Sequence, residues 1–438
     1  MITLILDGSH VHDPLAERVL KQLLQALAGR GWSAERMIVR DQKIGNCAGD
    51  FFCWVKTPGI CNVNDDNRAV AAKVVASDLV IYLSPVTFGG YSSTFKRAQD
   101  HLIQNISPFF TTINGEVHHQ KRYRKYPRLL VIGWLEQPDP QAEAVFQHLA
   151  WRNSINMYAS AAACGVLHGE QSNNEFSSAL EHWLEQTAQK QAKIAHLALT
   201  QPAAAAANLP APRRAVLLVG SPRTRESTSA ALGGYLFEQL AERGLETEVI
   251  QLYTSLNAAE RLQALFTSVD QADLVVLAFP LYIDSLPAPV IAGLEKIAAH
   301  RAERGGLAQP GMFAAIANSG FPEARHNETA LAICAEFARQ TGLTWMGSLA
   351  LGGGEGLVHG TPLTKMDGRA QPLIIGLQMA AEALAQGLPI PQSARDVFTR
   401  PVVPAFLYRL FGGLGWKQMA KGYGTQKRLR DHPYKQEI

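Results

Sequence analysis

The clearest structural signal in the chain is the segment AVLLVGS at residues 215–221, a short apolar run that stops at a Gly-Ser pair. An amphipathic helical pattern follows it from Ala230 to Leu240. The same succession opens the chain, where ITLILDGS at residues 2–9 precedes a helical pattern from Leu15 to Leu27. Strand-like runs that alternate with helices of this length predict βαβ units and a parallel sheet.

A second pair of matching segments indicates that the chain repeats itself. SDLVIYLSP at residues 77–85 and ADLVVLAFP at 272–280 share Asp-Leu-Val and end at Pro. Between the halves, residues 198–212 read ALTQPAAAAANLPAP, a composition typical of a semi-rigid linker. We therefore predict an α/β protein with two tandem doubly wound domains. Its parts are a domain at 1–197, a linker at 198–212, a domain at 213–392 and a C-terminal arm at 393–438.

The composition narrows the class of protein. Of 438 residues, 47% are apolar and 18% are charged, so the chain can form packed cores and is not disordered throughout. The net charge of +3 does not favour nucleic acid as a partner. No apolar run approaches the roughly 18 residues of a membrane span. Five Cys and a start, MITLILDGS, without a basic region predict a soluble cytoplasmic protein.

The segment GSPRTRESTS at residues 220–229 predicts a phosphate site. A glycine at the end of a strand allows a tight turn, and hydroxyl groups follow where the next helix begins. The free N–H groups and the dipole of a helix N-terminus attract phosphate, and Arg223 can add hydrogen bonds. A Ser/Thr-rich turn can also be only a helix cap. Ligands of α/β sheets, however, bind beyond the carboxyl ends of the strands, where this segment lies.

A second loop in each half follows the third predicted strand. It reads PLYIDSLP at residues 280–287 and PVTFGGYS at 85–92. Each loop offers an aromatic side chain and backbone groups to a flat heteroaromatic ring, although each can also be an ordinary connection between strand and helix. Together with the phosphate segment, these loops describe a mononucleotide site with phosphate at one end and a ring at the other.

These segments resemble a known family. LVGSPRTRESTS (218–229), AFPLYIDSLPAPVIAGLE (278–295) and NSGFPEARHNETAL (318–331) look like the flavodoxin-like NAD(P)H-dependent FMN reductases. In the first half, residues 44–66 and 84–102 are similar to flavodoxin-family oxidoreductases and iron–sulfur flavoproteins. The resemblance implies two flavodoxin-like domains, each with a five-stranded parallel sheet in the order 2-1-3-4-5, with FMN as cofactor and NAD(P)H as electron source.

The motifs of the family mark the candidate cofactor-binding residues in both halves. In the second half they are Ser221, Arg223, Ser227, Thr228, Ser229, Pro280, Leu281, Tyr282, Ile283, Asp284, Asn318 and Gly320. In the first half they are Ser9, Pro85, Thr87, Phe88 and Gly89. Among these, we expect contacts to the ring from Tyr282, Asp284, Asn318, Thr87, Phe88 and Gly89.

The first half departs from the pattern in its first loop, which reads DGSHVHD at residues 7–13. The resemblance leads us to expect Asn-Gly-Ser-Pro-Arg there. Asp7 and Asp13 would repel an FMN phosphate unless protonated His10 and His12 offset them. We therefore expect FMN in the second half, whereas the first half binds flavin through an altered loop or takes another ligand. A metal pair made by the two histidines is a weaker interpretation.

Cys47, Cys53 and Cys61 lie between the second and third predicted strands, in a connection about 17 residues longer than its counterpart in the second half. A cluster-binding loop would read Cys-x2-Cys-x2-Cys before a fourth Cys, but Asp50 stands at the second position. Three interpretations remain open: a compact wall beside a ligand ring, an iron–sulfur cluster, or thiol redox chemistry. The other cysteines, Cys164 and Cys334, lie in apolar segments and are predicted to be core.

Other polar segments admit more than one interpretation. Five basic residues between Lys121 and Arg128 form either a solvated surface or a site for an NADP phosphate. The pair Lys96 and Arg97 has the same ambiguity. GGGEG at residues 352–356 predicts a flexible loop over the site.

The tail from Ser393 has nine Lys or Arg against three Asp or Glu. It is predicted to pack as an arm on a domain or on a partner subunit. The alternative is a helix on a membrane surface, but Gly412, Gly413 and Gly415 interrupt the helical pattern.

These observations predict an FMN-dependent oxidoreductase that passes electrons from NAD(P)H through the flavin to a small-molecule acceptor, such as flavin, a quinone or another organic compound. The cofactor carries this chemistry, and no catalytic side chain stands out. We expect a homodimer without a nucleic-acid partner. The alternatives are an electron carrier for a protein partner, with or without an iron–sulfur cluster, and a tandem in which one half is not catalytic.

Overall fold

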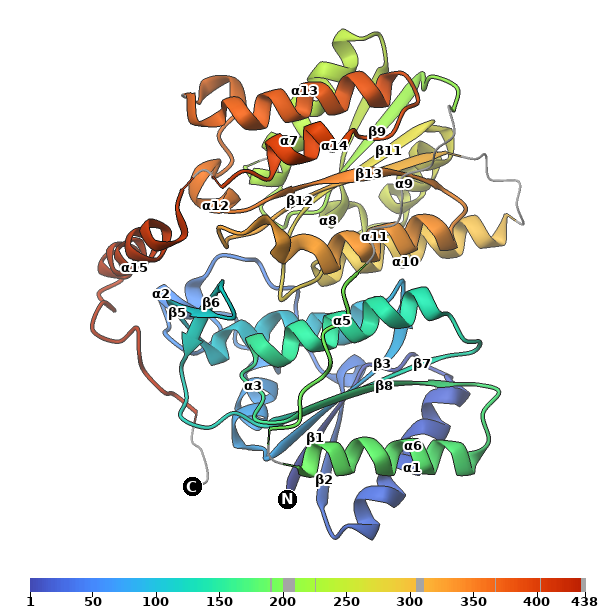
Figure 1. The fold of residues 1–438 in the computed structure, drawn as a ribbon, viewed down its shortest axis with the longest axis vertical. Coiled ribbons are helices and arrows are strands. Elements are labelled where there is room, and N and C mark those ends of the chain that lie inside the picture. Colours follow the sequence, from blue (N-terminus) through green and yellow to red (C-terminus); the bar gives the residue numbers. More distant parts are fainter. Residues whose placement is uncertain are drawn as a thin grey trace. The chain divides into compact units, whose positions relative to one another are not determined.

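The structure is a computed structural model that describes residues 1–189, 191–199, 209–224, 226–304, 311–366, 368–401 and 403–434. The chain divides into two compact units (Figure 1). One is formed by Met1–Ala198 with the chain from Arg409 onward, and the other by Leu199–Tyr408. Residues 200–208 of the predicted linker lie outside the described residues.

The first unit is built on a sheet with the strand order β2-β1-β3-β7-β8. The strands are β1 (Ile2–Asp7), β2 (Ser33–Ile38), β3 (Leu79–Thr87), β7 (Arg128–Leu135) and β8 (Ala162–His168). All neighbours in this path are parallel. The short β4 (Gly90–Tyr91) pairs antiparallel with the end of β3. In chain order the five parallel strands follow the predicted sequence 2-1-3-4-5.

Helices lie on both faces of this sheet. Figure 1 shows α1 (Pro14–Gly29) and α6 (Asn173–Ala188) along one face and α5 (Pro140–Asn156) along the other. The remaining helices are α2 (Phe52–Val55), α3 (Asn67–Ala76), α4 (Ser93–Gln99) and the 3-10 turns η1 (Val39–Asp41) and η2 (Asp100–Asn105). A separate antiparallel hairpin joins β5 (Ile106–Ile113) and β6 (Glu116–Lys121).

The second unit repeats this architecture with the order β10-β9-β11-β12-β13, again with parallel neighbours. Its strands are β9 (Arg214–Val219), β10 (Glu246–Gln251), β11 (Leu274–Pro280), β12 (Met312–Asn318) and β13 (Thr344–Leu351). Its helices are α7 (Thr228–Glu242), α8 (Leu252–Ser255), α9 (Ala259–Gln271), α10 (Ala288–Glu303), α11 (Glu328–Gln340), α12 (Gly354–Leu357), α13 (Gln371–Ala385) and α14 (Gln392–Phe398). Short 3-10 turns are η3 (Ala324–Asn327), η4 (Leu363–Lys365) and η5 (Gly368–Ala370). The predicted fold class, two tandem flavodoxin-like sheets, is confirmed.

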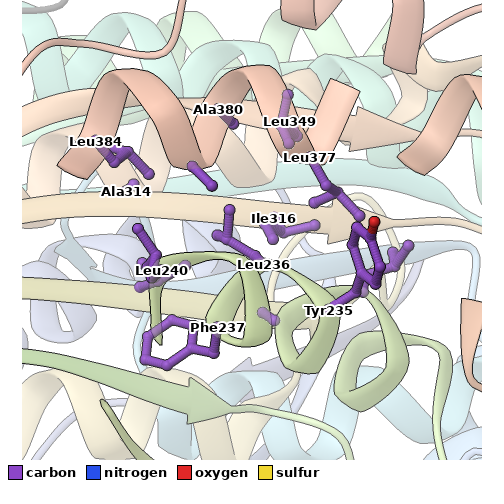
Figure 2. Packing of buried hydrophobic residues seen from close by; sticks show 14 of the residues in the cluster. Tyr235, Leu236, Phe237, Leu240, Ala314, Ile316, Leu349, Leu377, Ala380 and Leu384 are labelled. Atoms are coloured by element: carbon purple, nitrogen blue, oxygen red, sulfur yellow. The ribbon is translucent and has the colours of Figure 1, made fainter. Parts of the chain in front are cut away.

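The core of the second unit lies between the sheet and the pair of helices α7 and α13 (Figure 2). Leu236 and Leu240 of α7 meet Ile316 of β12, while Leu377 and Leu384 of α13 pack from the same side. Each of these five side chains is 1% exposed or less. Burying a side chain of this size stabilises the fold by about 1.5–3 kcal/mol, so this layer fixes the start of α7 against the sheet.

Parallel strands bring the candidate loops to one edge of each sheet, because all carboxyl ends lie there. In the second unit this edge carries residues 220–227, 280–287 and 318–327. In the first unit it carries residues 8–13 and 85–92. The repeat found in the sequence therefore places the equivalent loops at equivalent edges.

The tail is helical over α15 (Ala405–Lys421), and from Arg409 on it belongs to the first unit. The prediction that three glycines interrupt this helix is wrong, since α15 continues through all of them. Gly412 fits for a packing reason: a Cβ atom there would lie 2.5 Å from Phe110 Cε2, so the glycine allows a close approach to the β5–β6 hairpin. None of the described helices is long and apolar enough to cross a membrane.

Candidate functional site

The first loop of the second unit leads from β9 into α7. Gly220 is required at its start, because a Cβ atom there would lie 2.6 Å from Val290 Cγ2. Ser227 is the N-cap of α7: its Oγ accepts a hydrogen bond from Ala230 N at 3.1 Å and donates one to the carbonyl oxygen of Thr224 at 2.7 Å. The N-terminus of a long helix therefore stands at the carboxyl edge of the sheet, the arrangement that suits an anion.

The predicted phosphate contacts gather at this helix start. Ser221, Ser227, Thr228 and Ser229 are each 4% exposed or less. Thr228 Oγ1 donates to the carbonyl oxygen of Gly354 at 3.3 Å, which ties the helix to the segment that follows β13. These hydroxyl residues could be predicted together because they are close in the sequence, and the structure shows that all four are buried.

Arg223 is already bound to a carboxylate. Its Nη1 lies 2.6 Å from Glu355 Oε1 in α12, and His359 Nδ1 lies 3.0 Å from the same oxygen. Glu355 belongs to the Gly-rich segment 352–356, which was expected to be a flexible loop and instead includes the start of α12. A phosphate that used Arg223 would have to compete with Glu355, a contact that the sequence did not reveal.

The ring-type loop of the second unit is a tight turn. Tyr282 N donates to Ser285 O at 2.9 Å, and Ser285 N donates to Tyr282 O at 3.1 Å. Ile283 and Asp284 between them have φ values of +43° and +61°, as in a two-residue hairpin turn. The buried Ser285 Oγ has no hydrogen-bond partner among the described residues. A buried hydroxyl in this state is unusual, and a bound ring with polar edges would supply the partner.

Asn318 connects the loops of this site. Its Nδ2 donates to Ser229 Oγ at 2.9 Å and to the carbonyl oxygen of Phe279 at 3.0 Å. Leu281 N in turn donates to the Asn318 carbonyl oxygen at 2.8 Å. The amide hydrogen atoms of Asn318 thus hold α7 and the end of β11 together, while its contact to a ring stays a prediction. At Gly320, a Cβ atom would have no neighbour within 4 Å, so space is open beside the end of β12.

The first loop of the first unit is occupied by charges of the protein itself. Asp7 Oδ1 accepts a hydrogen bond from Ser9 N at 2.8 Å, and Arg36 Nη2 lies 2.6 Å from Asp7 Oδ2. Arg40 Nη1 donates to Ser9 Oγ at 2.7 Å. The offset expected from His10 and His12 is therefore not needed for Asp7, because Arg36 of β2 neutralises its carboxylate, while Arg40 of η1 binds Ser9. Neither arginine was recognised from the sequence, although basic residues beside the first strand were the available signal.

Asp13 fills the helix N-terminus in the first unit. Its Oδ1 accepts a hydrogen bond from Ala16 N at 2.9 Å as the N-cap of α1, and its Oδ2 accepts one from Trp134 Nε1 at 3.0 Å. His10 and His12 are exposed. A carboxylate thus occupies the place that a hydroxyl, Ser227, has in the second unit, and its charge would repel a phosphate.

The ring-type loop of the first unit is formed by the end of β3 and the turn into β4. Phe88 and Gly89 make this turn with φ values of +52° and +77°. A Cβ atom at Gly89 would lie 2.7 Å from Val145 Cβ, so the turn is packed directly on α5. Phe88 is only 7% exposed, whereas Pro85 and Thr87 are half-buried in β3.

A buried polar group lies under this loop and was not predicted as a unit. Lys96 and Asp100 form an ion pair within α4 and η2, with side chains 0% and 1% exposed. Tyr91 Oη and Gln99 Nε2 both donate to Asn153 Oδ1, at 2.9 Å and 2.7 Å. The Lys96 side chain is therefore buried in an ion pair and is not exposed to a ligand or to solvent. Removing either charge would leave the other buried without its partner.

The cysteine loop is a packed wall in this structure. Trp54 is 1% exposed and its Nε1 donates to the carbonyl oxygens of Ile103 and Ile106, each at 3.1 Å. All five cysteines are free thiols. Burial, followed by the charge of Asp100, raises the pKa of Cys47 to about 12. Within the described residues, no group of three or more His, Cys, Asp or Glu side chains is placed to hold a metal ion, so the geometry does not favour a cluster at Cys47, Cys53 and Cys61.

The basic run splits into two roles. Arg122 is 3% exposed, and its Nη1 donates to the carbonyl oxygens of Leu429 and Asp431 at 3.3 Å and 2.7 Å, so it holds the C-terminal arm. The other members line a cavity of about 890 Å³ beside Asp78; they are Lys121, Arg124, Lys125 and Arg128. This cavity lies at the amino ends of β3, β7 and β8, the opposite edge from the loops described above. That location does not suit an NADP phosphate at the flavin-type edge of the first unit.

Two doubly wound sheets with a phosphate-type helix start and a ring-type turn at one edge define a mononucleotide-binding protein of the flavodoxin-like class. The family model for NADPH-dependent FMN reductases matches residues 1–163 and again residues 213–347. The chain belongs to the NADPH-dependent FMN reductase family, a family of FMN-dependent oxidoreductases, and each half carries the match.

Individual relatives share parts of the chain. An iron–sulfur flavoprotein of Methanocaldococcus jannaschii is 32% identical over 82 residues, which are 19% of this chain and 42% of that protein. The chain thus matches less than half the length of this curated relative. Among solved structures, an FMN-dependent NADH-azoreductase of Bacillus anthracis in complex with FMN is 15% identical, with a TM-score of 0.30 over 39% of this chain and 99% of that one. An NAD(P)H:quinone oxidoreductase of Methanothermobacter marburgensis is 15% identical, with a TM-score of 0.28 over 40% and 96% of the two chains.

Proposed function

We propose that the protein is an FMN-dependent oxidoreductase that passes electrons from NAD(P)H to a small organic acceptor, such as a flavin, a quinone or an azo compound. The domain at residues 213–392 holds the FMN. The observation that carries this proposal is the group of four buried hydroxyl residues at and before the N-terminus of α7, which Asn318 connects to the segment that leads into the turn at Tyr282–Ser285.

The residues present fit FMN at this edge. Ser221, Ser227, Thr228 and Ser229 offer hydroxyl groups and backbone N–H groups to a phosphate, and the helix dipole favours its charge. The unpartnered Ser285 hydroxyl and the open space beside Gly320 suit a polar-edged ring. When bound, FMN supplies the hydride and electron chemistry, and the protein contributes binding and orientation.

The same comparison argues against FMN in the first half. There the helix N-terminus is capped by the Asp13 carboxylate, and Ser9 is bound to Arg40. A phosphate would have to displace a carboxylate that already holds two N–H groups, those of Ala16 and Trp134. We therefore infer one FMN per chain and a first half with a different role.

The proposal includes a cytoplasmic homodimer. Five free cysteines support a reducing compartment. Size-exclusion chromatography with light scattering tests the oligomer: a mass of twice 47.7 kDa is expected, and a monomer at micromolar concentration contradicts it.

Steady-state oxidation of NADH and NADPH by the FMN-loaded chain tests the activity. We expect turnover that depends on an added quinone, flavin or azo compound and that saturates with each. Flavin that is reduced by NAD(P)H without turnover of any small acceptor would support an electron carrier instead. A chain that holds FMN but is not reduced by either nucleotide contradicts the proposal.

A further inference from the structure

The cysteine loop contains a thiol with its own base. Cys61 Sγ lies 3.6 Å from His101 Nδ1, within the range of a sulfur hydrogen bond. His101 Nε2 lies 2.9 Å from the carbonyl oxygen of Gly45. A carbonyl oxygen can only accept, so Nε2 carries the hydrogen atom and Nδ1 presents its lone pair to the thiol. This is the order of nucleophile, base and orienting group that activates a side chain for attack.

Asp65 acts on both partners of this pair: its charge stabilises an imidazolium at His101, whereas burial and then the charge of Asp65 raise the pKa of the Cys61 thiol. Asp65 lies close enough to His101 for each charge to stabilise the other, and hydrogen bonds from Gly45 N and Asn67 N hold the Asp65 carboxylate in place at 2.9 Å each. Burial would raise the pKa of Asp65, but these hydrogen bonds and His101 lower it, so it stays ionised. An imidazolium formed at His101 would therefore have a fixed negative charge beside it.

Cys61 is partly buried, whereas His101 is only 3% exposed. One wall beside the thiol is the C-terminal arm, because Cys61 N and Tyr434 Oη both donate to Gln104 Oε1 at 2.8 Å. The base is therefore held inside the protein, beside a thiol that is only partly covered.

The neighbouring thiols have no comparable base in the described part of the chain. Burial raises the pKa of Cys47 to about 12 and that of Cys53 well above its ordinary value. Burial also raises the pKa of the Cys61 thiol. Its reactivity therefore depends on His101 taking the proton during attack rather than on a standing thiolate.

We propose that Cys61 is a nucleophilic thiol that reacts with small hydroperoxides, with His101 as its general base. Cys61 sulfur attacks the outer peroxide oxygen, the S–O bond forms and the O–O bond breaks. The sulfur is oxidised by two electrons and the peroxide is reduced. The thiol proton passes through His101 to the leaving oxygen, so that Cys-SH and ROOH give Cys-SOH and ROH. This inference does not depend on flavin in either half.

The test is chemical trapping in the intact chain. Purified protein is exposed to a few equivalents of hydrogen peroxide with dimedone, and each cysteine peptide is quantified by mass spectrometry. We expect adducts at Cys61 at least about tenfold faster than at Cys334, which is 0% exposed and serves as an internal control. Cys61→Ser must remove this adduct.

His101→Gln separates the base from the fold. The Gln amide can still donate to the Gly45 carbonyl oxygen, but it has no lone pair in the position of Nδ1. We expect the rate at Cys61 to fall about tenfold or more, with circular dichroism and the rates at other cysteines unchanged. Asp65→Asn leaves His101 in place and removes a charge with opposite effects on the thiol and the imidazole, so it should change the rate by a smaller factor than His101→Gln does.

Two results would overturn the proposal. One is a Cys61 rate equal to that of Cys334, or one that is the same in folded wild-type protein, His101→Gln and Asp65→Asn. The other is stoichiometric iron and sulfide in protein purified without oxygen, because the thiols would then be ligands and not nucleophiles.

Discussion

At the residue scale, the hydroxyl groups at the start of α7 help to cap and fix the helix, and we propose that the same groups bind the phosphate of the ligand. Ser227 makes both capping hydrogen bonds of its loop, and Ser229 is held by Asn318. Such groups are pre-arranged before a phosphate arrives, so little order has to be created on binding. Changes at these positions should therefore affect stability and flavin affinity together.

Ser227→Ala tests this coupling. Loss of the N-cap should lower the free energy of unfolding of the second unit by about 1 kcal/mol and weaken FMN binding several-fold. Urea unfolding and fluorescence titration with FMN measure the two effects. Ser172→Ala is the matched control, because Ser172 caps α6 in the first unit. It should cost similar stability and leave FMN affinity unchanged; equal loss of affinity in both variants would contradict the assignment.

Glu355→Gln tests the competition for Arg223. The pair is about one-third exposed on each side, so its net contribution is about 0–1 kcal/mol. Freeing Arg223 should tighten FMN binding by up to about fivefold. Riboflavin lacks the phosphate and should bind wild type and variant equally. A weaker FMN complex, or an equal gain for riboflavin, would show that Glu355 does not compete with the phosphate.

The carboxylate of Asp78 makes the stability of the first unit depend on pH. Lys125, and then the N–H of Ile2, hold the pKa of Asp78 below its ordinary value of 3.8. A carboxyl group whose pKa is lower in the folded state stabilises the fold above its unfolded pKa and loses this effect as pH falls. Asp78→Asn should therefore reduce stability at pH 7 and have less effect below about pH 3.8. An equal effect at both pH values in urea unfolding would contradict this explanation.

At the scale of elements, the helices α1 and α7 illustrate how one fold position can gain or lose a ligand. Both begin at the carboxyl edge of a parallel sheet and both have a side-chain N-cap. The cap is Asp13 in α1 and Ser227 in α7, so only the second helix begins with a cap that carries no negative charge. We propose that this difference in the capping side chain underlies different roles of the two halves.

The C-terminal arm is an element that the first unit needs for its own packing. Trp416 contacts Phe51 and Trp54 with ring centroids at 5.3 Å and 5.1 Å. Trp416→Ala should lower the free energy of unfolding of the first unit by about 2 kcal/mol and reduce amide protection at residues 51–55. Phe411→Ala is the control on the same helix, since Phe411 is 59% exposed. Equal effects in hydrogen exchange would contradict packing by Trp416.

At the scale of the whole molecule, the tandem organisation could be derived from the sequence because the repeat is local and apolar. The apolar runs at residues 2–9 and 215–221 form β1 and β9, and each of these strands lies between two parallel neighbours in its sheet. The candidate residues of the second half also meet at one edge, as the order of parallel strands requires. These features depend on periodicity and chain order, which a single sequence contains.

Other features depend on neighbours that only the fold brings together. Arg36 and Arg40 reach the first loop across β1 and β2, and Glu355 reaches Arg223 over more than a hundred residues. Gly412 looked like a helix breaker because its packing partner, Phe110, is even more distant in sequence. Charge pairing and close packing of this kind are decided by tertiary contacts, so local patterns do not reveal them.

We propose that the two halves have different roles because the FMN phosphate binds only in the second half. The most direct test is the FMN content per chain in wild type, Ser221→Asp and Ser9→Asp, two residues that follow the equivalent Gly in the two halves. The account predicts one FMN per wild-type chain, its loss in Ser221→Asp, and full retention in Ser9→Asp. Two FMN per chain, or loss in Ser9→Asp with retention in Ser221→Asp, would contradict it.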